Sequence, residues 1–367
     1  DAAKFEVSGN PYAVLVYDMQ PIPAFTSNYV LGTVEFQIPW DIPAQTVSLE
    51  LISPSGNTNS LDVVYIDSGS SVLNMNIDQT YQGMDLAFGA NLRSFNVLPA
   101  DNSTSNVLSS VYSFLTGIIG QGVASSPNPL LGGWVGNLIE IDQTSAYWIK
   151  TDQSCQYEMR ANPTYSEELE GGGWIRDISF GANLVAYPCL IGSGDIESVI
   201  PDQYEGSFTG IIGEGVAASP NPSLGWVGSL AGEGFRPGGG YWIKSDDDLD
   251  DFYWECPEID PCTTDSHSRE IVESGDLPEE LSYTQSTEQA FYFIESISLK
   301  DSQLEIGDWI LAFYGDQVVG ARKWSGPFTD IPVMGNDGAE YSVGYISKGG
   351  LPEFKLYREG EMIDLYG

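Results

Sequence analysis

The chain has few positive charges and a single histidine. Its 367 residues include 14 Lys and Arg against 52 Asp and Glu, so the net charge is −38. This balance argues against binding to nucleic-acid phosphates or to anionic lipid. With one histidine, the commonest general base and metal ligand is missing from most catalytic schemes. Such a negative chain stays soluble in high salt, where screening weakens self-repulsion, and a saline medium is a natural setting for it.

Long apolar runs are also absent. No stretch of about 18 apolar residues occurs, so the sequence predicts no membrane-spanning helix. The hydrophobic fraction is 42% and aromatics reach 12%, which is enough to build cores. The chain opens Asp1-Ala2-Ala3-Lys4, without Met and without an apolar signal core. Either a leader has been removed or the sequence is a fragment, and removal of a leader fits the rest better.

Cysteine is scarce but even in number. The four residues, which allow three pairings, are Cys155, Cys189, Cys256 and Cys262. Their spacing is not that of a zinc site, and only one histidine could assist. The alternative is four unrelated buried thiols. We expect two disulfides, which predicts an oxidising, extracellular location.

The strongest signal is an internal duplication. The block FGANLRSFNV from Phe88 returns as FGANLVAYPC from Phe180, and the block TGIIGQGVASSPNP from Thr116 returns as TGIIGEGVAASPNP from Thr209. Each copy then ends in Tyr-Trp-Ile-Lys, at 147–150 and at 241–244. Three blocks in one order at nearly constant offset indicate two tandem copies of one domain.

Strand-like patterns dominate the whole chain. Short alternating runs between turn residues predict an Ig-like sandwich before the repeats, and a short helix is expected over 106–114. After the repeats we expect strands over 290–297, 309–314, 317–321, 339–346 and 353–357. The predicted fold class is all-β: a tandem array of β-sandwich-like modules that includes two copies of one small β-rich domain. The predicted parts are 1–83 (sandwich), 84–160 (copy 1), 161–175 (connector), 176–256 (copy 2), 257–282 (acidic linker) and 283–367 (C-terminal sandwich-like module).

Acidic residues crowd together after the second Tyr-Trp-Ile-Lys block. This candidate calcium site consists of Asp246, Asp247, Asp248, Asp250 and Asp251. Calcium prefers such oxygen ligands, but the spacing departs from an EF-hand and the first copy has only Thr151-Asp152-Gln153 there. The alternative interpretation is a solvated acidic loop.

No catalytic constellation stands out. His267 lies in the predicted linker, where a solvated residue is the simpler interpretation. The glycine-rich stretches at 117–122 and 210–215 match no phosphate-binding signature and predict structural turns. Among 52 acids, nothing isolates the carboxylate pair of a hydrolase. We therefore expect no catalytic residue.

Tryptophans recur at matching positions of the two copies: Trp134 with Trp226, and Trp148 with Trp242. Repeated tryptophans in repeated contexts favour a role in the core. The alternative is a platform of exposed rings that stacks on sugars.

The repeat blocks also resemble known modules. The sequence GIIGEGVA…PNP…GWVGSL…PGGGYWIK resembles repeat modules of secreted bacterial surface proteins and of structural or fibre proteins of marine phages. The C-terminal blocks IGDWILAFYGDQVVGARKW and DIPVMGNDG are similar to a companion module of such proteins. The resemblance covers 84–256 and 283–367, and copy 1 departs from it at 139–146, where the Pro-Gly-Gly-Gly turn is absent. It implies a structural role at a cell or virion surface and brings no catalytic residues.

The sequence thus predicts a non-enzymatic extracellular or virion-surface structural protein, such as a filament or fibre subunit, a capsid decoration or an adhesin. Expected partners are further copies or other structural subunits, joined for example by strand addition from 1–7 or from the last strand. Nucleic acid and membrane insertion are not expected. The alternative is a secreted carbohydrate-binding protein that uses exposed aromatics, with calcium as its one candidate cofactor.

Overall fold

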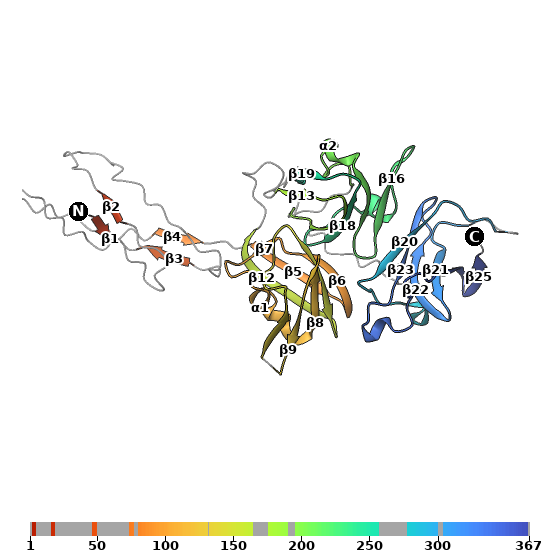
Figure 1. Cartoon of the computed structure of the whole chain (residues 1–367), viewed down its shortest axis with the longest axis horizontal. Helices are drawn as coiled ribbons and strands as arrows, with labels where there is room; N and C mark the ends of the chain where they lie inside the picture. Colours follow the sequence, from red (N-terminus) through yellow and green to blue (C-terminus); the bar gives the residue numbers. More distant parts are fainter. Residues whose placement is uncertain are drawn as a thin grey trace, which may run out of the picture. The chain divides into compact units, whose positions relative to one another are not determined.

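The computed structural model consists mainly of antiparallel strands, which confirms the all-β class (Figure 1). The structure describes residues 2–4, 16–18, 46–49, 73–76, 80–130, 132–163, 175–189, 195–256, 277–299 and 304–365. Within these ranges no helix is long and apolar enough to cross a membrane. The chain divides into two compact units, one of them 1–81 with 99–101 and 160–162, and the other the remainder.

In the first unit two strand pairs are described. β1 (Ala2–Lys4) pairs with β2 (Val16–Asp18), and β3 (Thr46–Leu49) pairs with β4 (Leu73–Asn76), both antiparallel. Residues 80–83, the end of the predicted Ig-like sandwich, instead begin β5 (Thr80–Leu86), which pairs with β12 (Cys155–Pro163) in another sheet. The remainder of the predicted sandwich lies outside the described residues. Part of the proposed donor segment 1–7 is therefore already paired within its own chain, over Ala2–Lys4.

Copy 1 contains two sheets. The larger has the order β10-β9-β8-β11-β6, with β6 (Gly89–Ser94), β8 (Leu115–Gly120), β9 (Val123–Asn128), β10 (Gly133–Gly136) and β11 (Ala146–Thr151). The smaller has the order β5-β12-β7, with β5 (Thr80–Leu86), β7 (Val97–Leu98) and β12 (Cys155–Pro163). Leu86, Ile149 and Tyr157, buried residues from both sheets, belong to one core cluster. This two-layer arrangement is sandwich-like.

The helix expected over 106–114 is present as two short pieces. α1 (Thr104–Val107) begins at Ser103, whose Oγ accepts a hydrogen bond from the Asn106 N–H, and η1 (Ser109–Phe114) follows as a 3-10 helix. The apolar positions at helical spacing, among them Val107 and Val111, are buried in the core of copy 1. The sequence pattern therefore identified the correct buried face.

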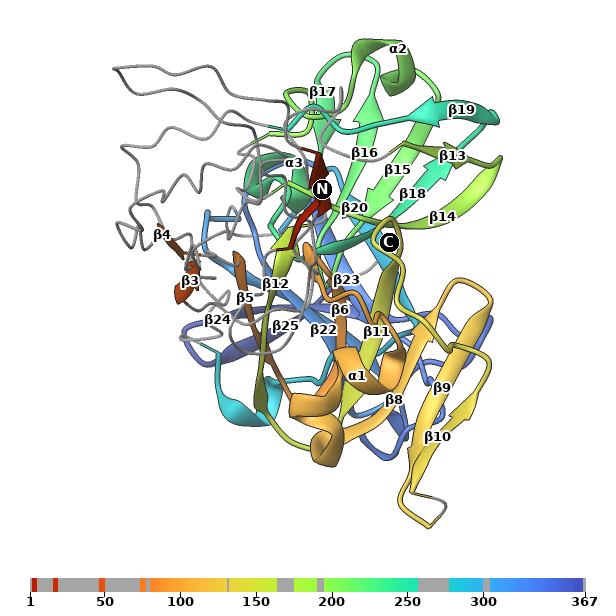
Figure 2. The same ribbon diagram turned by 90° about the vertical axis from the view of Figure 1, so that its left-hand side faces the viewer.

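Copy 2 repeats the strand order of copy 1. Its larger sheet is β14-β18-β15-β16-β17, formed by β14 (Gly181–Ala186), β15 (Phe208–Ile212), β16 (Ala217–Asn221), β17 (Gly225–Val227) and β18 (Gly240–Ser245). These strands correspond one to one with β6, β8, β9, β10 and β11, and Figure 2 shows both sheets. A second sheet pairs β13 (Arg176–Ile178) with β19 (Leu249–Phe252). The short helices are α2 (Asp202–Glu205) and α3 (Ser229–Glu233).

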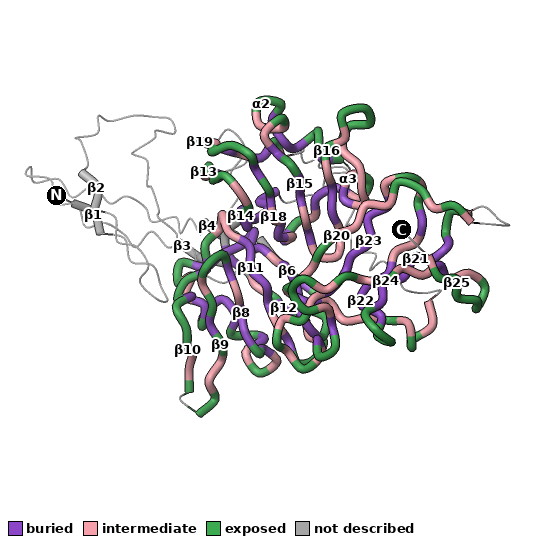
Figure 3. The backbone as a smooth tube through the Cα atoms, turned by 45° about the vertical axis from the view of Figure 1, so that its right-hand side comes forward, coloured by how far each residue is buried: buried purple, intermediate pink, exposed green. Residues whose placement is uncertain are grey.

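The last residue of the Gly-Trp-Val-Gly block must be glycine in both copies. Gly136 and Gly228 have positive φ angles of 143° and 109°. A Cβ on them would lie 2.2 Å from the Ala124 carbonyl oxygen and 2.5 Å from that of Ala217. Any other residue at these positions would push the neighbouring strand away. The loop between β9 and β10, by contrast, is exposed, with Leu130 96% accessible (green in Figure 3).

The C-terminal module is a second kind of sandwich. One sheet pairs β20 (Gln289–Ile294) with β23 (Thr329–Met334), and the other has the order β22-β21-β24-β25, with β21 (Trp309–Tyr314), β22 (Gln317–Lys323), β24 (Glu353–Arg358) and β25 (Glu361–Leu365). The short 3-10 helices are η2 (Glu279–Leu281) and η3 (Glu340–Ser342). The predicted hairpin is present, because Tyr314 pairs with Gln317 across a two-residue turn in which Gly315 has a φ of 61°.

One strand prediction in this module is wrong. The segment 339–346 was expected to be a strand, but it holds η3 and turns, and only Ile346 forms an isolated bridge. The reason is local hydrogen bonding: the Ser342 hydroxyl donates to Asp337 Oδ1 at 2.8 Å, and the Ala339 N–H donates to the same atom at 3.0 Å. The fully buried strand missed by the sequence reading is β23.

Candidate functional site

The two repeat copies meet through corresponding residues of their larger sheets. Leu92 and Trp148 of copy 1 lie in one apolar cluster with Leu184 and Trp242 of copy 2. Leu184 holds in copy 2 the position that Leu92 holds in copy 1, and Trp242 holds the position of Trp148. An interface in which positions meet their own counterparts is isologous, so the copies are related by a pseudo-two-fold axis.

Hydrogen bonds across this inter-repeat joint are also reciprocal. The Leu92 N–H donates to Glu214 Oε2 at 2.7 Å, and the Leu184 N–H donates to Gln121 Oε1 at 2.9 Å. Gln121 and Glu214 are corresponding residues of the two TGIIG blocks. One side chain of each copy thus caps an outward backbone N–H on the sheet of the other.

Farther along the same two strands the pattern continues with backbone acceptors. The Ser94 N–H of β6 donates to the Gly238 oxygen at 2.8 Å, and the Ala186 N–H of β14 donates to the Thr144 oxygen at 3.0 Å. These four residues are again two corresponding pairs. Because buried backbone donors are costly to leave unpaired, the joint fixes the register between the copies.

The joint departs from symmetry in its charges. Arg93 forms an ion pair with Glu214, and the two side chains are only 12% and 14% exposed. At the corresponding places stand Val185 and Gln121, which are neutral. The Leu92 half of the joint therefore contains a partly buried ion pair. In the other half a neutral amide accepts the Leu184 N–H, and the Arg176 guanidinium donates to the Thr144 oxygen at 2.8 Å.

The C-terminal module covers one surface of copy 1. We call it the Lys150 surface and define it by Phe88, Ala90 and Lys150. The Phe88 ring meets the Tyr341 ring edge to face at a centroid distance of 5.7 Å. The Ala90 N–H donates to the Gln285 oxygen at 3.3 Å. Lys150 lies opposite Ala90 in the β6–β11 ladder and reaches Asp337 of the module.

Asp337 is the centre of this contact. Its side chain is 2% exposed, and Lys150 Nζ lies 3.1 Å from its Oδ2. Oδ2 also accepts hydrogen bonds from the Tyr341 hydroxyl at 2.8 Å and from the N–H and hydroxyl of Thr287 at 3.2 and 3.1 Å. Burial by itself raises the pKa of Asp337, but the hydrogen bonds from Tyr341, Ser342 and Lys150 outweigh it and hold the pKa well below its usual range.

A second buried carboxylate joins the module to copy 2. Asp330, 1% exposed, accepts hydrogen bonds from the N–H and hydroxyl of Ser229, both at 2.7 Å, and from the Ala217 N–H at 3.2 Å. Arg322 lies 3.3 Å from its Oδ2 and also donates to the Gly215 oxygen. Burial raises the pKa of Asp330, while Arg322 and Ser229 act in the opposite direction. Ionic and hydrogen-bonding groups therefore hold the module against both copies.

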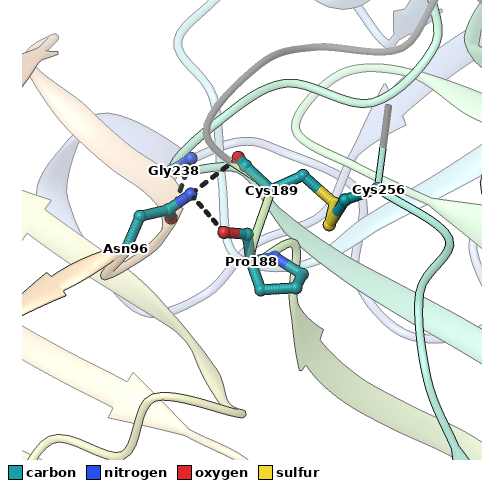
Figure 4. Close-up of a disulfide and its surroundings, with 5 residues drawn as sticks. All are labelled: Asn96, Pro188, Cys189, Gly238 and Cys256. Atoms are coloured by element: carbon teal, nitrogen blue, oxygen red, sulfur yellow. Dashed lines mark hydrogen bonds between the residues drawn. A yellow bond between two sulfur atoms is a disulfide. The ribbon is translucent and has the colours of Figure 1, made fainter. Parts of the chain in front are cut away.

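One disulfide lies beside the inter-repeat joint. Cys189 and Cys256 are bonded, with Cα atoms 5.4 Å apart (Figure 4). Asn96 of copy 1 donates its side-chain N–H groups to the Pro188 and Cys189 oxygens at 3.2 and 2.9 Å, and its Oδ1 accepts from the Gly238 N–H at 3.1 Å. The disulfide thus fixes the Pro188–Cys189 segment, to which Asn96 donates its hydrogen bonds.

Of the two expected disulfides, the described residues contain one, Cys189–Cys256. Cys155, half-buried in β12, carries a free thiol, and burial raises its pKa. Cys262 lies outside the described residues, as does His267. Cys155 is bonded to neither of the other described cysteines, because these two are bonded to each other. A second disulfide stays a prediction from the cysteine count.

The acidic run follows β18 and enters β19. Asp248 Oδ1 accepts a hydrogen bond from the Phe180 N–H at 2.7 Å, and Asp247 Oδ2 accepts one from the Ser207 hydroxyl at 3.4 Å. Asp250 and Asp251 are exposed residues of β19. Among the described residues no three acidic, cysteine or histidine side chains gather in a way that could hold a metal ion. The calcium site, which includes Asp246, therefore stays a prediction from the sequence.

The repeated tryptophans pack inward. Trp148 is 3% exposed and Trp242 packs against the same inter-repeat cluster. Trp134 packs against the copy 1 core and its ring meets Tyr112. Trp226 packs against the copy 2 core. Over the part of the chain that is described, no tryptophan belongs to the exposed large hydrophobics, which favours the expected role of these rings in packing.

Sequence reasoning missed the joints. Asp337 lies in an Asn336-Asp337-Gly338 sequence that is typical of a turn, and Asp330 does not stand out among 52 acids. The available signal was the duplication itself, since Glu214 and Gln121 share a position in a repeated block. The glycine-rich stretches around them form β8 and β15 and the turns that follow, as structural elements.

Comparison of the chain with family models, with curated proteins and with solved structures finds no match.

Proposed function

We propose that this chain is a non-enzymatic structural protein that works outside the cell or on a virion surface, as a subunit of a larger assembly. The observation that carries the proposal is the use made of its buried charges. Asp330, Asp337 and the Arg93–Glu214 pair all serve contacts between modules. A further buried carboxylate, Asp308, forms an ion pair with Arg358 inside the C-terminal module. These carboxylates, the usual candidates for catalysis, thus take part in ion pairs within and between modules.

Three further features fit this role. A disulfide suits an oxidising environment, and the net charge of −38 suits a saline one. The inter-repeat joint is dense in buried apolar and polar contacts, so the two copies resist bending relative to each other. A rigid block of this kind transmits force and presents surfaces at fixed positions, which is what a filament, fibre or decoration subunit requires.

The inward packing of the four tryptophans gives no support to carbohydrate binding through exposed rings, so the structural role is the proposal we retain.

The test is electron microscopy of the purified full chain at the ionic strength of sea water. Ordered assemblies of uniform width or symmetry are expected. Single particles alone, at every protein concentration tried, would overturn the proposal. Mass spectrometry without reductant on the same sample checks the compartment argument, and the expected result is one intact Cys189–Cys256 bridge.

A further inference from the structure

Copy 2 carries a counterpart of the Lys150 surface. We call it the Lys244 surface and define it by Phe180, Ala182 and Lys244, which stand at the positions of Phe88, Ala90 and Lys150. Lys244 lies opposite Ala182 in the β14–β18 ladder, as Lys150 lies opposite Ala90 in copy 1. The two copies therefore present the same three groups on the same place of the same sheet.

The two surfaces differ in what covers them. Ala90 is 2% exposed and a Cβ on Gly89 would lie 2.6 Å from Thr284 of the C-terminal module. A Cβ on Gly181, the residue that corresponds to Gly89, would meet nothing within 4 Å. Phe180 is 71% exposed, against 46% for Phe88. The Lys244 surface is thus exposed, whereas the corresponding surface of copy 1 is covered by the C-terminal module.

Its polar groups are open as well. The Ala90 N–H has the Gln285 oxygen as acceptor, whereas the Ala182 N–H, on the same outward side of its strand, donates to no group in the described part of the chain. Lys150 has Asp337 as its counter-ion, whereas Lys244 is exposed and forms no ion pair with any described residue. A partner that covers this surface would supply a carboxylate for Lys244 and apolar area for Phe180.

The charges beside Lys244 indicate which partner that is. Copy 1 continues after Lys150 with Thr151-Asp152-Gln153-Ser154, but copy 2 continues with the acidic turn 246–248. Asp248 is fixed at the rim of the surface, because its Oδ1 accepts the Phe180 N–H at 2.7 Å. The surface therefore carries a lysine without a counter-ion among the described residues and, beside it, carboxylates that suit the lysine of a second chain. Two such surfaces are complementary to each other.

We propose that the Lys244 surface is a self-association surface, at which two copies of this chain meet around a two-fold axis. Lys244 of each chain then faces the acidic turn of the other chain, and the two Phe180 rings are buried between the two chains. A two-fold interface pairs residue i with j and j with i, so one such surface provides two ion pairs and needs no second patch. The inference rests on the proposed function, since it names one contact of the assembly. High salt weakens the repulsion between two chains of charge −38, while ion pairs buried in the interface are screened much less.

The test is sedimentation velocity of the full chain over a concentration series, at the ionic strength of sea water. The variants are Lys244→Glu, the pair Asp246→Lys with Asp248→Lys, and Phe180→Ser. Each is expected to weaken self-association by about tenfold or more, because the contacts are central to the interface. Far-UV circular dichroism and thermal melting establish that each variant is folded.

The decisive experiment mixes two variants in which the charges of Lys244 and of the acidic turn are reversed separately. The Lys244→Glu chain mixed with the Asp246→Lys, Asp248→Lys chain is expected to recover association as mixed pairs. One of the two contacts then keeps its native sign, and the other is restored with reversed sign. Loss of association in the single variants without recovery in the mixture would overturn the two-fold pairing.

Matched controls lie elsewhere on the same unit. Leu224→Ser changes an apolar side chain that is 61% exposed beside β17, at the opposite edge of the copy 2 sheet, and Lys348→Glu reverses an exposed charge in the C-terminal module. Both are expected to leave association unchanged. If the native chain associates and the Lys244-surface variants behave like these controls, the surface is wrong while the proposed function stands. If the native chain stays monomeric throughout and forms no assemblies, both fall.

Discussion

Copy 1 and copy 2 share one strand order but hold their last strand by different means. In copy 1, Val97 belongs to β7, which joins the nine-residue strand β12 in a three-stranded sheet. In copy 2 the corresponding residue is Cys189, and the shorter β19 is followed by a disulfide from Cys256. In copy 1, hydrogen bonds between strands β7 and β12 fix this segment. In copy 2 a disulfide fixes the corresponding segment, so a duplicated fold can replace one kind of link by the other.

The largest expected effect comes from removing that bond. The double change Cys189→Ala, Cys256→Ala opens a connection with a sequence separation of 67 and is expected to lower the free energy of unfolding by about 4 kcal/mol. Urea denaturation followed by fluorescence measures it. Val97→Ala, at the position of Cys189 in copy 1, is the matched control and is expected to cost about 2 kcal/mol. Equal losses in the two copies would mean that the disulfide adds nothing beyond packing.

The next effect separates the two lysines. Lys150→Met leaves the buried Asp337 without its counter-ion and is expected to cost about 2 kcal/mol, since Lys150 itself is 15% exposed. Lys244→Met, at the same place in copy 2, is expected to change stability by less than about 0.5 kcal/mol. Thermal melting of the two variants side by side checks this. A shift of the same size in both would show that the Asp337 contact is not what holds Lys150.

Acid should weaken the copy 1 contact specifically. The folded-state pKa of Asp337 is depressed, so its contribution is fully present above the unfolded value of about 3.9 and is lost as the pH falls below it. The folded-state pKa of Asp330 is raised, so its contribution to the free energy of unfolding increases as the pH falls, opposite to that of Asp337. The difference in unfolding free energy between the native chain and Asp337→Asn is therefore expected to shrink on acidification from pH 5 downward. A difference that stays constant would contradict this assignment.

The smallest effect tests the asymmetry of the inter-repeat joint. Glu214→Gln gives copy 2 the residue that copy 1 has, keeps an acceptor for the Leu92 N–H and removes the ion pair with Arg93. The expected loss is about 1 kcal/mol. In the reverse change, Gln121→Glu, Val185 stands at the place of Arg93, and Arg176 already donates to the Leu184 and Thr144 oxygens. The expected gain is therefore smaller than the loss from Glu214→Gln. A gain from Gln121→Glu equal to the loss from Glu214→Gln would show that Arg93 is not the cause.

The sequence predicted the modules better than their contacts. The all-β class, the duplication, the helix near 106–114 and the hairpin at Tyr314 follow from periodicity and turn residues, which act over a few positions. Asp330 and Asp337 could not be selected, because their importance depends on burial between modules that are distant in sequence. The strand expected over 339–346 failed for a local reason: side-chain hydrogen bonds to Asp337 replaced a backbone ladder. Pairing of cysteines likewise depends on geometry that spacing does not contain.

The reciprocal joint has a consequence for how the molecule responds to dilution. Two separate modules with this interface would associate only above a threshold protein concentration. Because copy 1 and copy 2 are consecutive in one chain, their pairing is intramolecular, and each experiences the other at an effective concentration set by the connection between them. The pairing therefore persists at protein concentrations at which two separate modules would dissociate.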